Sequence, residues 1–194
     1  PASATTAIDV TLPLHNSQMK AVFIDESKSK AFVLCAIFVN VEHVPSIRRD
    51  LNRLRLKGQS RIHFVSESNR RRRQILSVYR TLPIEVRFFE TRGEPESESR
   101  EKCFRELAKA LPSGDYCEVW IEADSNHVDL DKTVLTNALK AEAKSSNVIF
   151  SHSDPRTQIL LWIPDALAWV MTRGGDWHKE LRGFNIWSHR HRKS

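Results

Sequence analysis

Two apolar runs near the start of the chain predict a β-hairpin. The first run covers residues 20–25 and the second covers residues 31–39, and both are rich in Val, Ile and Phe. The residues that join them, ESKSK, are polar and few enough for a hairpin connection. Because the second run is apolar throughout, we expect other elements to cover both of its faces.

The rest of the chain alternates between helical and extended patterns. Apolar residues at helical spacing predict helices within residues 44–58, 66–82, 100–111, 131–144 and 157–172. Extended apolar patterns predict strands at residues 61–64, 84–90, 116–123 and 147–150. Helices that alternate with strands after an opening hairpin are typical of a mixed sheet with helices on both faces, so we predict an α/β fold.

The predicted elements belong to one domain. A length of 194 residues suits a single domain, and no internal repeat or linker divides the chain. We predict that this domain covers residues 20–176. Residues 1–19 are polar and lack a clear pattern, so we expect a flexible N-terminal arm there, followed at the other end by a basic C-terminal extension over residues 177–194.

The composition is typical of a globular protein without membrane spans. Hydrophobic residues make up 40% of the chain and charged residues 28%. The longest mainly apolar segment, residues 159–171, has 13 residues, which is too few to cross a bilayer. The N-terminus lacks the basic start and apolar core of a signal peptide. Three cysteines without a C-x-x-C spacing predict buried thiols in a reducing compartment, so we expect a cytoplasmic protein.

Positive charge is concentrated in one part of the chain. Residues 46–73 contain ten Arg or Lys and two acids, a net charge of +8, whereas the whole chain carries +6. Residues 172–194 contain six basic residues and two acids. Such a surface attracts polyanions by counterion release, so we expect RNA or DNA as the partner. The alternative is a solvated basic surface that serves only solubility.

The last predicted helix holds a carboxylate in apolar surroundings. Asp165 lies among Ile163, Ala166 and Leu167, and an unpaired carboxylate buried there would be costly or protonated. Pro164 stands inside the predicted helix, where we expect it to cause a kink. A buried acid beside a kink indicates a functional site. The alternative is that Asp165 caps the second half of a broken helix.

Two further acids stand where predicted strands end. Asp25 ends the first strand, and Asp124 follows the strand at 116–123. Asp124 alone would be interpreted as a turn residue, because Asp-Ser-Asn favours turns. Together with Asp165, however, these acids form a set of hard oxygen ligands of the kind that binds Mg²⁺ or Mn²⁺. Two such ions can activate a water molecule for phosphodiester cleavage.

Four short motifs resemble those of a known family. FIDES (23–27), RIHF (61–64), the strand that ends in Asp124, and IPDALAW (163–169) are similar to the bacterial domain-of-unknown-function family 3800. The resemblance covers residues 20–176. It implies a ribonuclease-H-like fold, in which a mixed sheet of about five strands has helices on both faces.

The same resemblance implies a set of metal ligands. It makes Asp25 the ligand from the first strand and Asp165 the ligand from the last helix. Asp124 is expected as the third ligand. Glu67, which precedes the second predicted helix, or Glu122 would supply a further carboxylate.

Other polar residues receive subordinate roles. Glu26 follows Asp25, so in a regular strand it points to the opposite face, and we expect a supporting group or a substitute ligand. The family usually has Gly after its Asp-Glu-Ser, whereas this chain has Lys28. His63 and His127 lie near predicted strand ends and could assist proton transfer, although an isolated histidine is more often structural.

Taken together, the motifs and the charge predict a divalent-metal-dependent nuclease that cleaves RNA or DNA with a metal-activated water. The basic residues expected to hold the nucleic-acid backbone are Lys57, Arg61, Arg70, Arg71, Arg72 and Arg73. One alternative is a non-catalytic nucleic-acid-binding protein with a ribonuclease-H-like fold. Another is an interaction protein whose basic surface binds an acidic partner.

Overall fold

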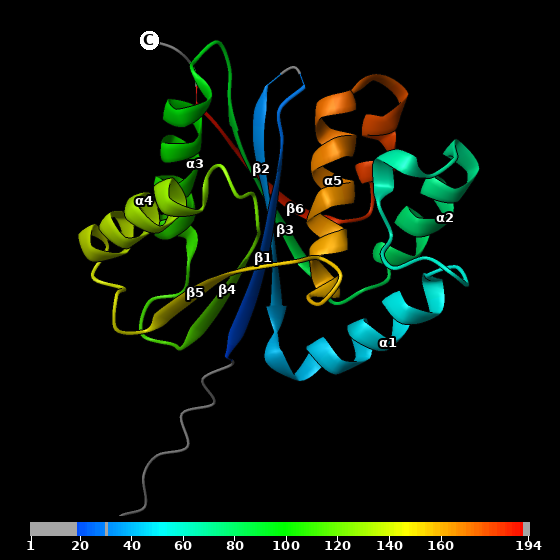
Figure 1. Ribbon diagram of the computed structural model, residues 1–194, viewed down its shortest axis with the longest axis horizontal. Helices are drawn as coiled ribbons and strands as arrows, with labels where there is room; N and C mark the ends of the chain where they lie inside the picture. The colour runs from blue at the N-terminus through cyan, green and yellow to red at the C-terminus, as the bar shows by residue number, and fades with distance from the viewer. Residues whose placement is uncertain (1–18, 30, 192–194) are drawn as a thin grey trace, which may run out of the picture.

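Six strands form one mixed sheet in the computed structural model, which describes residues 19–29 and 31–191 (Figure 1). They are β1 (Lys20–Ser27), β2 (Phe32–Asn40), β3 (Glu85–Thr91), β4 (Cys117–Glu122), β5 (Val148–Ser153) and β6 (Asn185–Arg190). Their order across the sheet is β5-β4-β1-β2-β3-β6. The β1–β2 and β2–β3 pairs are antiparallel, whereas β4 is parallel to β1, β5 to β4 and β6 to β3. The predicted mixed sheet is confirmed, with six strands instead of about five.

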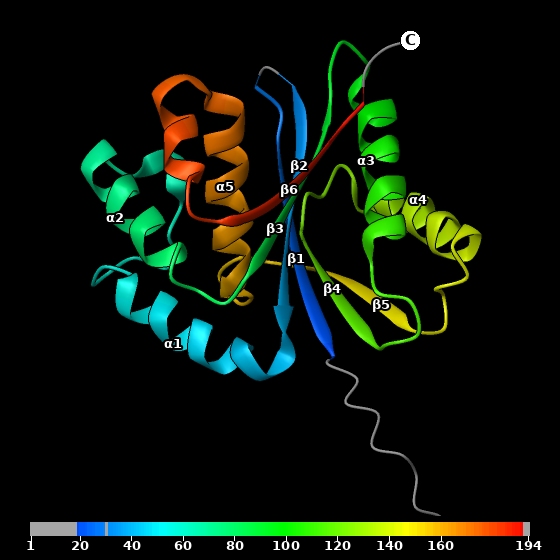
Figure 2. The ribbon, with the colours of Figure 1, turned by 180° about the vertical axis from the view of Figure 1, so that it is seen from behind.

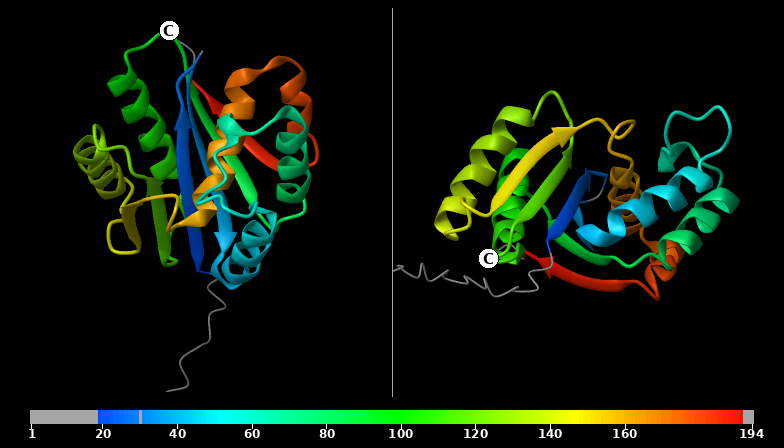
Figure 3. Two further views of the ribbon diagram at one scale, coloured as in Figure 1. Left: turned by 45° about the vertical axis from the view of Figure 1, so that its right-hand side comes forward. Right: turned by 90° about the horizontal axis from the view of Figure 1, so that it is seen from below.

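Two layers of helices cover the sheet. The α-helices of the described residues are α1 (Val44–Leu54), α2 (Asn69–Tyr79), α3 (Glu96–Ala110), α4 (Val128–Ala141) and α5 (Trp162–Arg173). Short 3₁₀ helices are η1 (Val41–His43), η2 (Phe64–Ser66), η3 (Ile159–Leu161) and η4 (Gly175–Leu181). Helices α1, α2 and α5 lie on one side of the sheet, and α3 and α4 lie on the other (Figures 2 and 3).

Alternation along β1 divides the core into two parts. Ala21 and Phe23 pack toward the layer of α1, α2 and α5, whereas Val22 and Ile24 pack toward α3 and α4. Successive side chains of a strand point to opposite faces. The two acids that follow, at positions 25 and 26, therefore belong to different sides of the sheet.

The C-terminal part contains a strand that the hydrophobic pattern does not predict. Residues 177–194 are predicted to be an extension, yet Asn185–Arg190 form β6 and pair with β3. Ile186 and Trp187, the apolar residues of β6, are 37% and 45% exposed. An edge strand that buries so little apolar surface gives a weak periodic signal. Residues 61–64, predicted as a strand, instead lead into η2, and residues 1–18 of the predicted arm lie outside the described residues.

Helix α5 begins later than its pattern predicts. Residues 159–161 form η3, and α5 starts at Trp162, so Pro164 falls in the first turn. The first backbone N–H groups of a helix have no partner within it, so a proline there removes no helical hydrogen bond. Pro164 is therefore part of the helix, as predicted, but its position in the first turn gives no reason for the predicted kink. Asp165 also lies in the first turn, where the helix dipole favours a carboxylate.

Candidate functional site

Asp25 and Glu122 stand side by side at the ends of two neighbouring parallel strands. The register pairs Ile24 of β1 with Ile121 of β4. Asp25 and Glu122, which directly follow these two residues, are therefore also neighbours. The residues two positions earlier on both strands pack on the α5 side of the sheet, which places both carboxylates on that face. The carboxyl group of Glu122 is hydrogen-bonded to that of Asp25.

Asp165 adds a third carboxylate from the helix that covers this face. Its Oδ2 accepts a hydrogen bond from the backbone N–H of Phe64 at 3.2 Å. Phe64 is fully buried, and its ring meets that of Trp169 edge to face, with the centroids 5.4 Å apart. The segment that contains the RIHF motif therefore orients Asp165 instead of forming a strand.

Burial and mutual repulsion oppose the ionisation of all three carboxyl groups together. Burial raises the pKa of Asp25 well above its ordinary value, and the charges of Glu122, Asp165 and Glu26 raise it further. Burial is also the largest cause of the raised pKa values of Glu122 and Asp165. Arg61 Nη1 donates to Glu122 Oε1 at 3.2 Å and offsets only part of this negative charge. A cation bound nearby would therefore stabilise the ionised form of these carboxyl groups.

Asp124 is bound to a different set of groups. Its Oδ1 accepts from the backbone N–H of Asn126 at 3.0 Å, and its Oδ2 accepts from His127 Nδ1 at 2.8 Å. Lys28 Nζ lies 3.6 Å from the same Oδ2. The backbone hydrogen bond and then the His127 contact lower the pKa of Asp124 to about 2. The structure therefore groups Glu122, and not Asp124, with Asp25 and Asp165.

A pocket of about 570 Å³ opens beside the carboxylates. Its lining comes from the ends of β1 and β4, namely Asp25, Glu26, Ser27, Lys28, Glu122, Ala123, Asp124 and Ser125. Ser27 Oγ lies 2.8 Å from Thr172 Oγ1, which ties the end of β1 to α5. Lys28, where the resembled family has Gly, places its Nζ 2.6 Å from Glu96 Oε1. The pocket therefore has polar walls and one basic side chain at its edge.

The oxygens of Asp25, Glu122 and Asp165 do not form a closed ligand shell. Among the described residues, one group of three potential ligands has one ligand atom from each residue within 4.8 Å of the others, and it consists of Glu106, His189 and His191. The expected convergence of Asp25, Asp124 and Asp165 is therefore not seen. Asp25 instead shares a hydrogen bond with Glu122 and lies close enough to Asp165 for the charge of Asp165 to raise its pKa.

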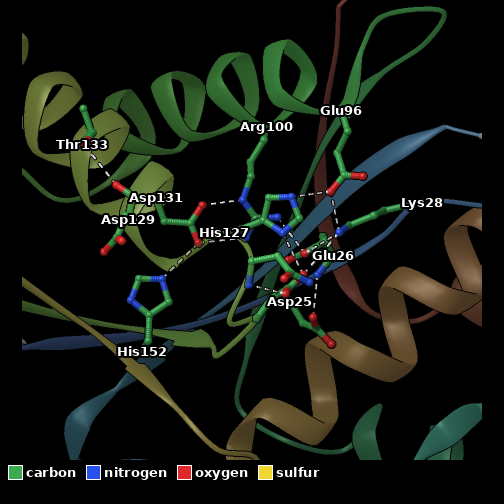
Figure 4. Close-up of polar contacts among 12 residues, drawn as sticks. Asp25, Glu26, Lys28, Glu96, Arg100, His127, Asp129, Asp131, Thr133 and His152 are labelled. Atoms are coloured by element: carbon green, nitrogen blue, oxygen red, sulfur yellow. Dashed lines mark hydrogen bonds and ion pairs between the residues drawn. The ribbon is translucent and has the colours of Figure 1, made fainter.

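Glu26 takes part in a buried network on the opposite face (Figure 4). Arg100 Nη1 donates to Glu26 Oε1 at 2.7 Å, and Arg100 Nη2 donates to Asp131 Oδ2 at 2.8 Å. Asp131 Oδ2 also accepts from His152 Nε2 at 3.0 Å. Arg100 is 0% exposed and Asp131 is 1% exposed. Glu26 thus points to the face opposite Asp25, as predicted, and there it forms a structural ion pair with Arg100.

Glu67 and His63 lie on the segment between α1 and α2. Glu67 Oε1 accepts a hydrogen bond from Gln59 Nε2 at 2.9 Å. The charge of Glu67 is not one of the main causes of the raised pKa of Asp25. His63, in contrast, interacts electrostatically with Glu122 of the carboxylate cluster. Burial and the charge of Arg61 lower its pKa, and Glu122 acts in the opposite direction. Of the two carboxylates left open by the sequence, Glu122 is the one that joins Asp25.

The predicted nucleic-acid-binding residues divide into two groups. Lys57 and Arg70 are exposed, and neither side chain has a hydrogen-bond or ion-pair partner among the described residues. Arg61 instead contacts Glu122. Lys57 and Arg70 are therefore the two available for a phosphate backbone without breaking an existing contact.

The remaining arginines of the predicted set make internal contacts. Arg71 donates to the backbone oxygen of Leu54. Arg73 Nε donates to Glu180 Oε1 at 3.3 Å. Arg72 Nε and Nη2 donate to the backbone oxygens of residues 64 and 65 at 3.0 and 2.7 Å. Its guanidinium also lies 4.4 Å from the centroid of the Trp169 ring. These three side chains hold the 61–66 segment, α1 and η4 in place.

The described residues contain no helix with both the length and the apolar character needed to cross a membrane. The three cysteines are buried and free. Burial raises the pKa of Cys103 and of Cys117 to about 12. These thiols are therefore neutral core residues, as the sequence predicts.

The order of the strands, with an antiparallel β1–β2–β3 unit extended by parallel β4 and β5, defines a ribonuclease-H-like fold. Over 84% of its length the chain is similar to 78% of a chain in the structure of the PCNA:RNase HII complex from Archaeoglobus fulgidus, with a TM-score of 0.53 and 15% identity. At this identity the likeness concerns the fold alone.

Two further structures are less similar. A mutant protein of Bst-RNase HIII has 13% identity and a TM-score of 0.46, over 78% of this chain and 51% of that chain. Bst-RNase HIII in complex with Mn²⁺ has 11% identity and a TM-score of 0.41, over 79% and 52%. No protein-family model and no curated protein matches the sequence.

Proposed function

We propose that the protein is a divalent-metal-dependent nuclease whose metal ligands are Asp25, Glu122 and Asp165. The proposal is carried by the placement of three largely buried carboxylates on one face of a ribonuclease-H-like sheet, at the ends of β1 and β4 and in the first turn of α5. Function resides in a site and not in a fold. Acids with raised pKa values beside a pocket are candidates for such a site.

The donor set fits Mg²⁺ or Mn²⁺. Carboxylate oxygens are hard ligands, which these ions prefer. The raised pKa of Asp25 reflects burial together with uncompensated negative charge, and a divalent cation would relieve that repulsion. When bound, such a cation lowers the pKa of a water nucleophile and stabilises charge that develops on a phosphate.

Side chains around the carboxylates would support the reaction. Arg61 donates to Glu122 and so fixes the direction of that carboxylate. His63 has a lowered pKa caused by burial and by Arg61, so it is neutral at pH 7 and able to accept a proton. Lys57 and Arg70 carry free positive charge that would attract the phosphates of RNA or DNA.

A cleavage assay with the full-length protein tests the proposal. Labelled single-stranded RNA, single-stranded DNA and an RNA–DNA hybrid are incubated with Mn²⁺, with Mg²⁺ or with EDTA. We expect products with at least one metal and none with EDTA. Asp25→Asn and Glu122→Gln should each reduce the rate by about 100-fold or more, because even a residue that only supports a metal ligand contributes 10- to 100-fold.

Two matched variants separate the ligand sets. Asp176 is exposed and pairs with Lys179 at 2.7 Å, so Asp176→Asn serves as the control with unchanged activity. Asp124→Asn should reduce the cleavage rate less than Asp25→Asn does, because Asp124 is bound to His127 and to the backbone. Cleavage that survives EDTA or Asp25→Asn contradicts the mechanism. Salt-dependent binding without products would favour a non-catalytic nucleic-acid-binding protein.

A further inference from the structure

A second group of potential metal ligands lies on the other face of the sheet, away from the carboxylate cluster. Glu106 belongs to α3, His189 to β6, and His191 follows the end of that strand. One ligand atom from each of these residues lies within 4.8 Å of the others. His189 Nε2 is 3.8 Å from Glu106 Oε2, and His191 Nε2 is 3.7 Å from Glu106 Oε1. This group does not depend on the proposed nuclease function.

The two histidines are presented by strand alternation. Residues 189 and 191 are two positions apart, so their side chains point to the same face. The register pairs His189 with Phe89 of β3, and Trp187, two positions earlier, meets the Phe89 ring at a centroid distance of 5.8 Å. Phe89 belongs to the core on the α3 side. The histidines therefore face α3, toward which β6 leads from the α5 side of the molecule (Figure 2).

Rigid elements hold all three ligands in position. The backbone N–H of His191 donates to the backbone oxygen of Glu90 at 2.9 Å, which continues the β3–β6 pairing past the end of the strand. Glu90 is 3% exposed, and its Oε2 accepts from Arg190 Nε at 2.9 Å. On α3, Phe104 and Leu107 are fully buried on either side of Glu106. The site is thus built on a helix and an anchored strand.

The distances suit a bridging ion better than direct contacts. Separations of 3.7 and 3.8 Å between ligand atoms are too long for hydrogen bonds. Two ligands that each lie about 2 Å from a tetrahedral zinc ion are separated by about 3.3 Å. The Nε2 atom of His191 is buried and has no hydrogen-bond partner, which is costly for a polar atom. A bound ion would satisfy this atom.

We propose that Glu106, His189 and His191 form a binding site for a transition-metal ion of the Zn²⁺ class. Two imidazole nitrogens and one carboxylate suit Zn²⁺ and similar ions, whereas Mg²⁺ prefers oxygen ligands alone. Three protein ligands leave a fourth position for water or an anion. Glu106 and His191 line a pocket of about 620 Å³ whose other walls include Lys102, Arg105 and Lys109. The open position would therefore face basic side chains.

Lys109 offers a specific way to test the site. Its Nζ lies 2.7 Å from Glu106 Oε1, so it competes with a metal for that oxygen. Lys109 is largely exposed, and such a helix-surface ion pair contributes little to stability. Lys109→Met should therefore strengthen metal binding while leaving the fold intact. A merely structural Glu106–histidine contact does not predict this gain.

The experiment uses Zn²⁺ and Co²⁺ with the full-length protein. Calorimetric titration should detect one Zn²⁺ per chain at this site, and Co²⁺ should give a visible absorption band that Zn²⁺ abolishes. Glu106→Gln and His189→Gln should weaken binding by at least about 10-fold. His178 is exposed on η4, so His178→Gln should leave affinity unchanged. Asp25→Asn should also leave it unchanged, which separates this site from the carboxylate cluster.

Thermal unfolding in EDTA shows whether each variant is folded. If Glu106→Gln or His189→Gln unfolds at a lower temperature in EDTA, the Lys109→Met variant still decides the question. Absence of Zn²⁺ binding to the native chain would overturn the proposal. Zn²⁺ affinity that stays the same in Glu106→Gln, His189→Gln and Lys109→Met would overturn it equally.

Discussion

Asp25 and Glu26 are consecutive in β1, and their carboxylates serve opposite faces of the sheet. Asp25 interacts with Glu122 and Asp165 on the α5 side of the sheet. Glu26 instead accepts a hydrogen bond from the buried guanidinium of Arg100 (Figure 4). The first acid is surrounded by negative charge and the second by a matched cation. One strand end thus carries a functional candidate and a structural anchor. The two acids should therefore respond in opposite ways to substitution.

Neutralising Asp25 should stabilise the protein. Its folded-state pKa is raised above the ordinary value of 3.8, so between these two values the native state binds more protons than the unfolded chain. The free energy of unfolding therefore falls as pH rises through that window. At pH 7, Asp25→Asn should raise the free energy of unfolding by about 1 kcal/mol, a typical gain when a strained functional group is removed. Chemical denaturation at pH 7 measures this difference.

The control for this effect is Asp176→Asn, which removes an exposed carboxylate and should leave stability within about 0.5 kcal/mol. Mn²⁺ or Mg²⁺ should stabilise the native chain more than the Asp25→Asn variant, because bound ligands stabilise the state that binds them. A destabilised Asp25→Asn variant would show that Asp25 is a structural residue and not a strained one.

Breaking the Arg100 network should lower the free energy of unfolding, which is the opposite of the effect expected for Asp25→Asn. Burial raises the pKa of Asp131, but hydrogen bonds from Arg100 and His152 outweigh it, and the pKa falls below its ordinary value. Asp131 therefore contributes stability that is present above its unfolded-state pKa and is lost as pH falls through the lowered value. Asp131→Asn should cost about 3 kcal/mol at pH 7, because it leaves a buried cation without its full partner.

Asp129 provides the matched comparison on the same helix. Its side chain is fully exposed, so Asp129→Asn should change the unfolding free energy by less than about 0.5 kcal/mol. Guanidinium denaturation at pH 7 and at pH 4 measures the unfolding free energy of the Asp131→Asn and Asp129→Asn variants. Equal stability of the two variants would mean that the buried ion pair contributes nothing.

How much of the site the sequence could predict depends on the range of the interactions. Alternation along β1 places positions 25 and 26 on opposite faces, and the helical pattern around Asp165 marks it as buried, so these two acids are accessible to pattern reasoning. The choice between Glu122 and Asp124 is different, because both would share one face if β4 continued. The strand ends at Glu122, and Asp124 accepts from Asn126 N–H within its own turn. Element ends are the least predictable feature.

The buried network shows a second limit. Arg100 lies on the apolar face of α3 with Cys103, Phe104 and Leu107. A charged residue at such a position can be recognised from the sequence as a buried charge. Its partner Asp131 comes from another helix, and no local pattern connects the two. The sixth strand is missed for a related reason, since its stability comes from pairing with β3 and not from its own apolar residues.

Arg70 and Arg72 should separate nucleic-acid binding from stability. Arg70→Ala removes an exposed charge without a described partner, so it should weaken nucleic-acid binding, reduce the salt dependence by about one ion and leave stability unchanged. Arg72→Ala removes two hydrogen bonds to the backbone and the contact with Trp169. It should lower the unfolding free energy by about 1–2 kcal/mol.

Fluorescence anisotropy with a labelled oligonucleotide at several salt concentrations measures the first effect, and thermal unfolding measures the second. The two variants remove the same charge from the same end of α2, so each is the control for the other. If Arg70→Ala binds as tightly as the native chain, the exposed end of α2 is not part of the nucleic-acid surface.

His63 should determine how cleavage depends on pH. Burial and the nearby charge of Arg61 lower its pKa below 6.5, so the imidazole remains neutral, and able to accept a proton, to lower pH than an ordinary histidine. If it accepts a proton during cleavage, the rate should begin to fall only at a pH below the ordinary histidine value of 6.5, because the pKa of His63 is lowered. His63→Gln should reduce the rate at pH 7 by about 100-fold and remove this acid limb. His178→Gln, which alters an exposed histidine on η4, should leave the profile unchanged. A His63→Gln enzyme that is slower by the same factor at every pH would instead assign His63 to the positioning of Glu122, because a positioning role does not depend on its own protonation.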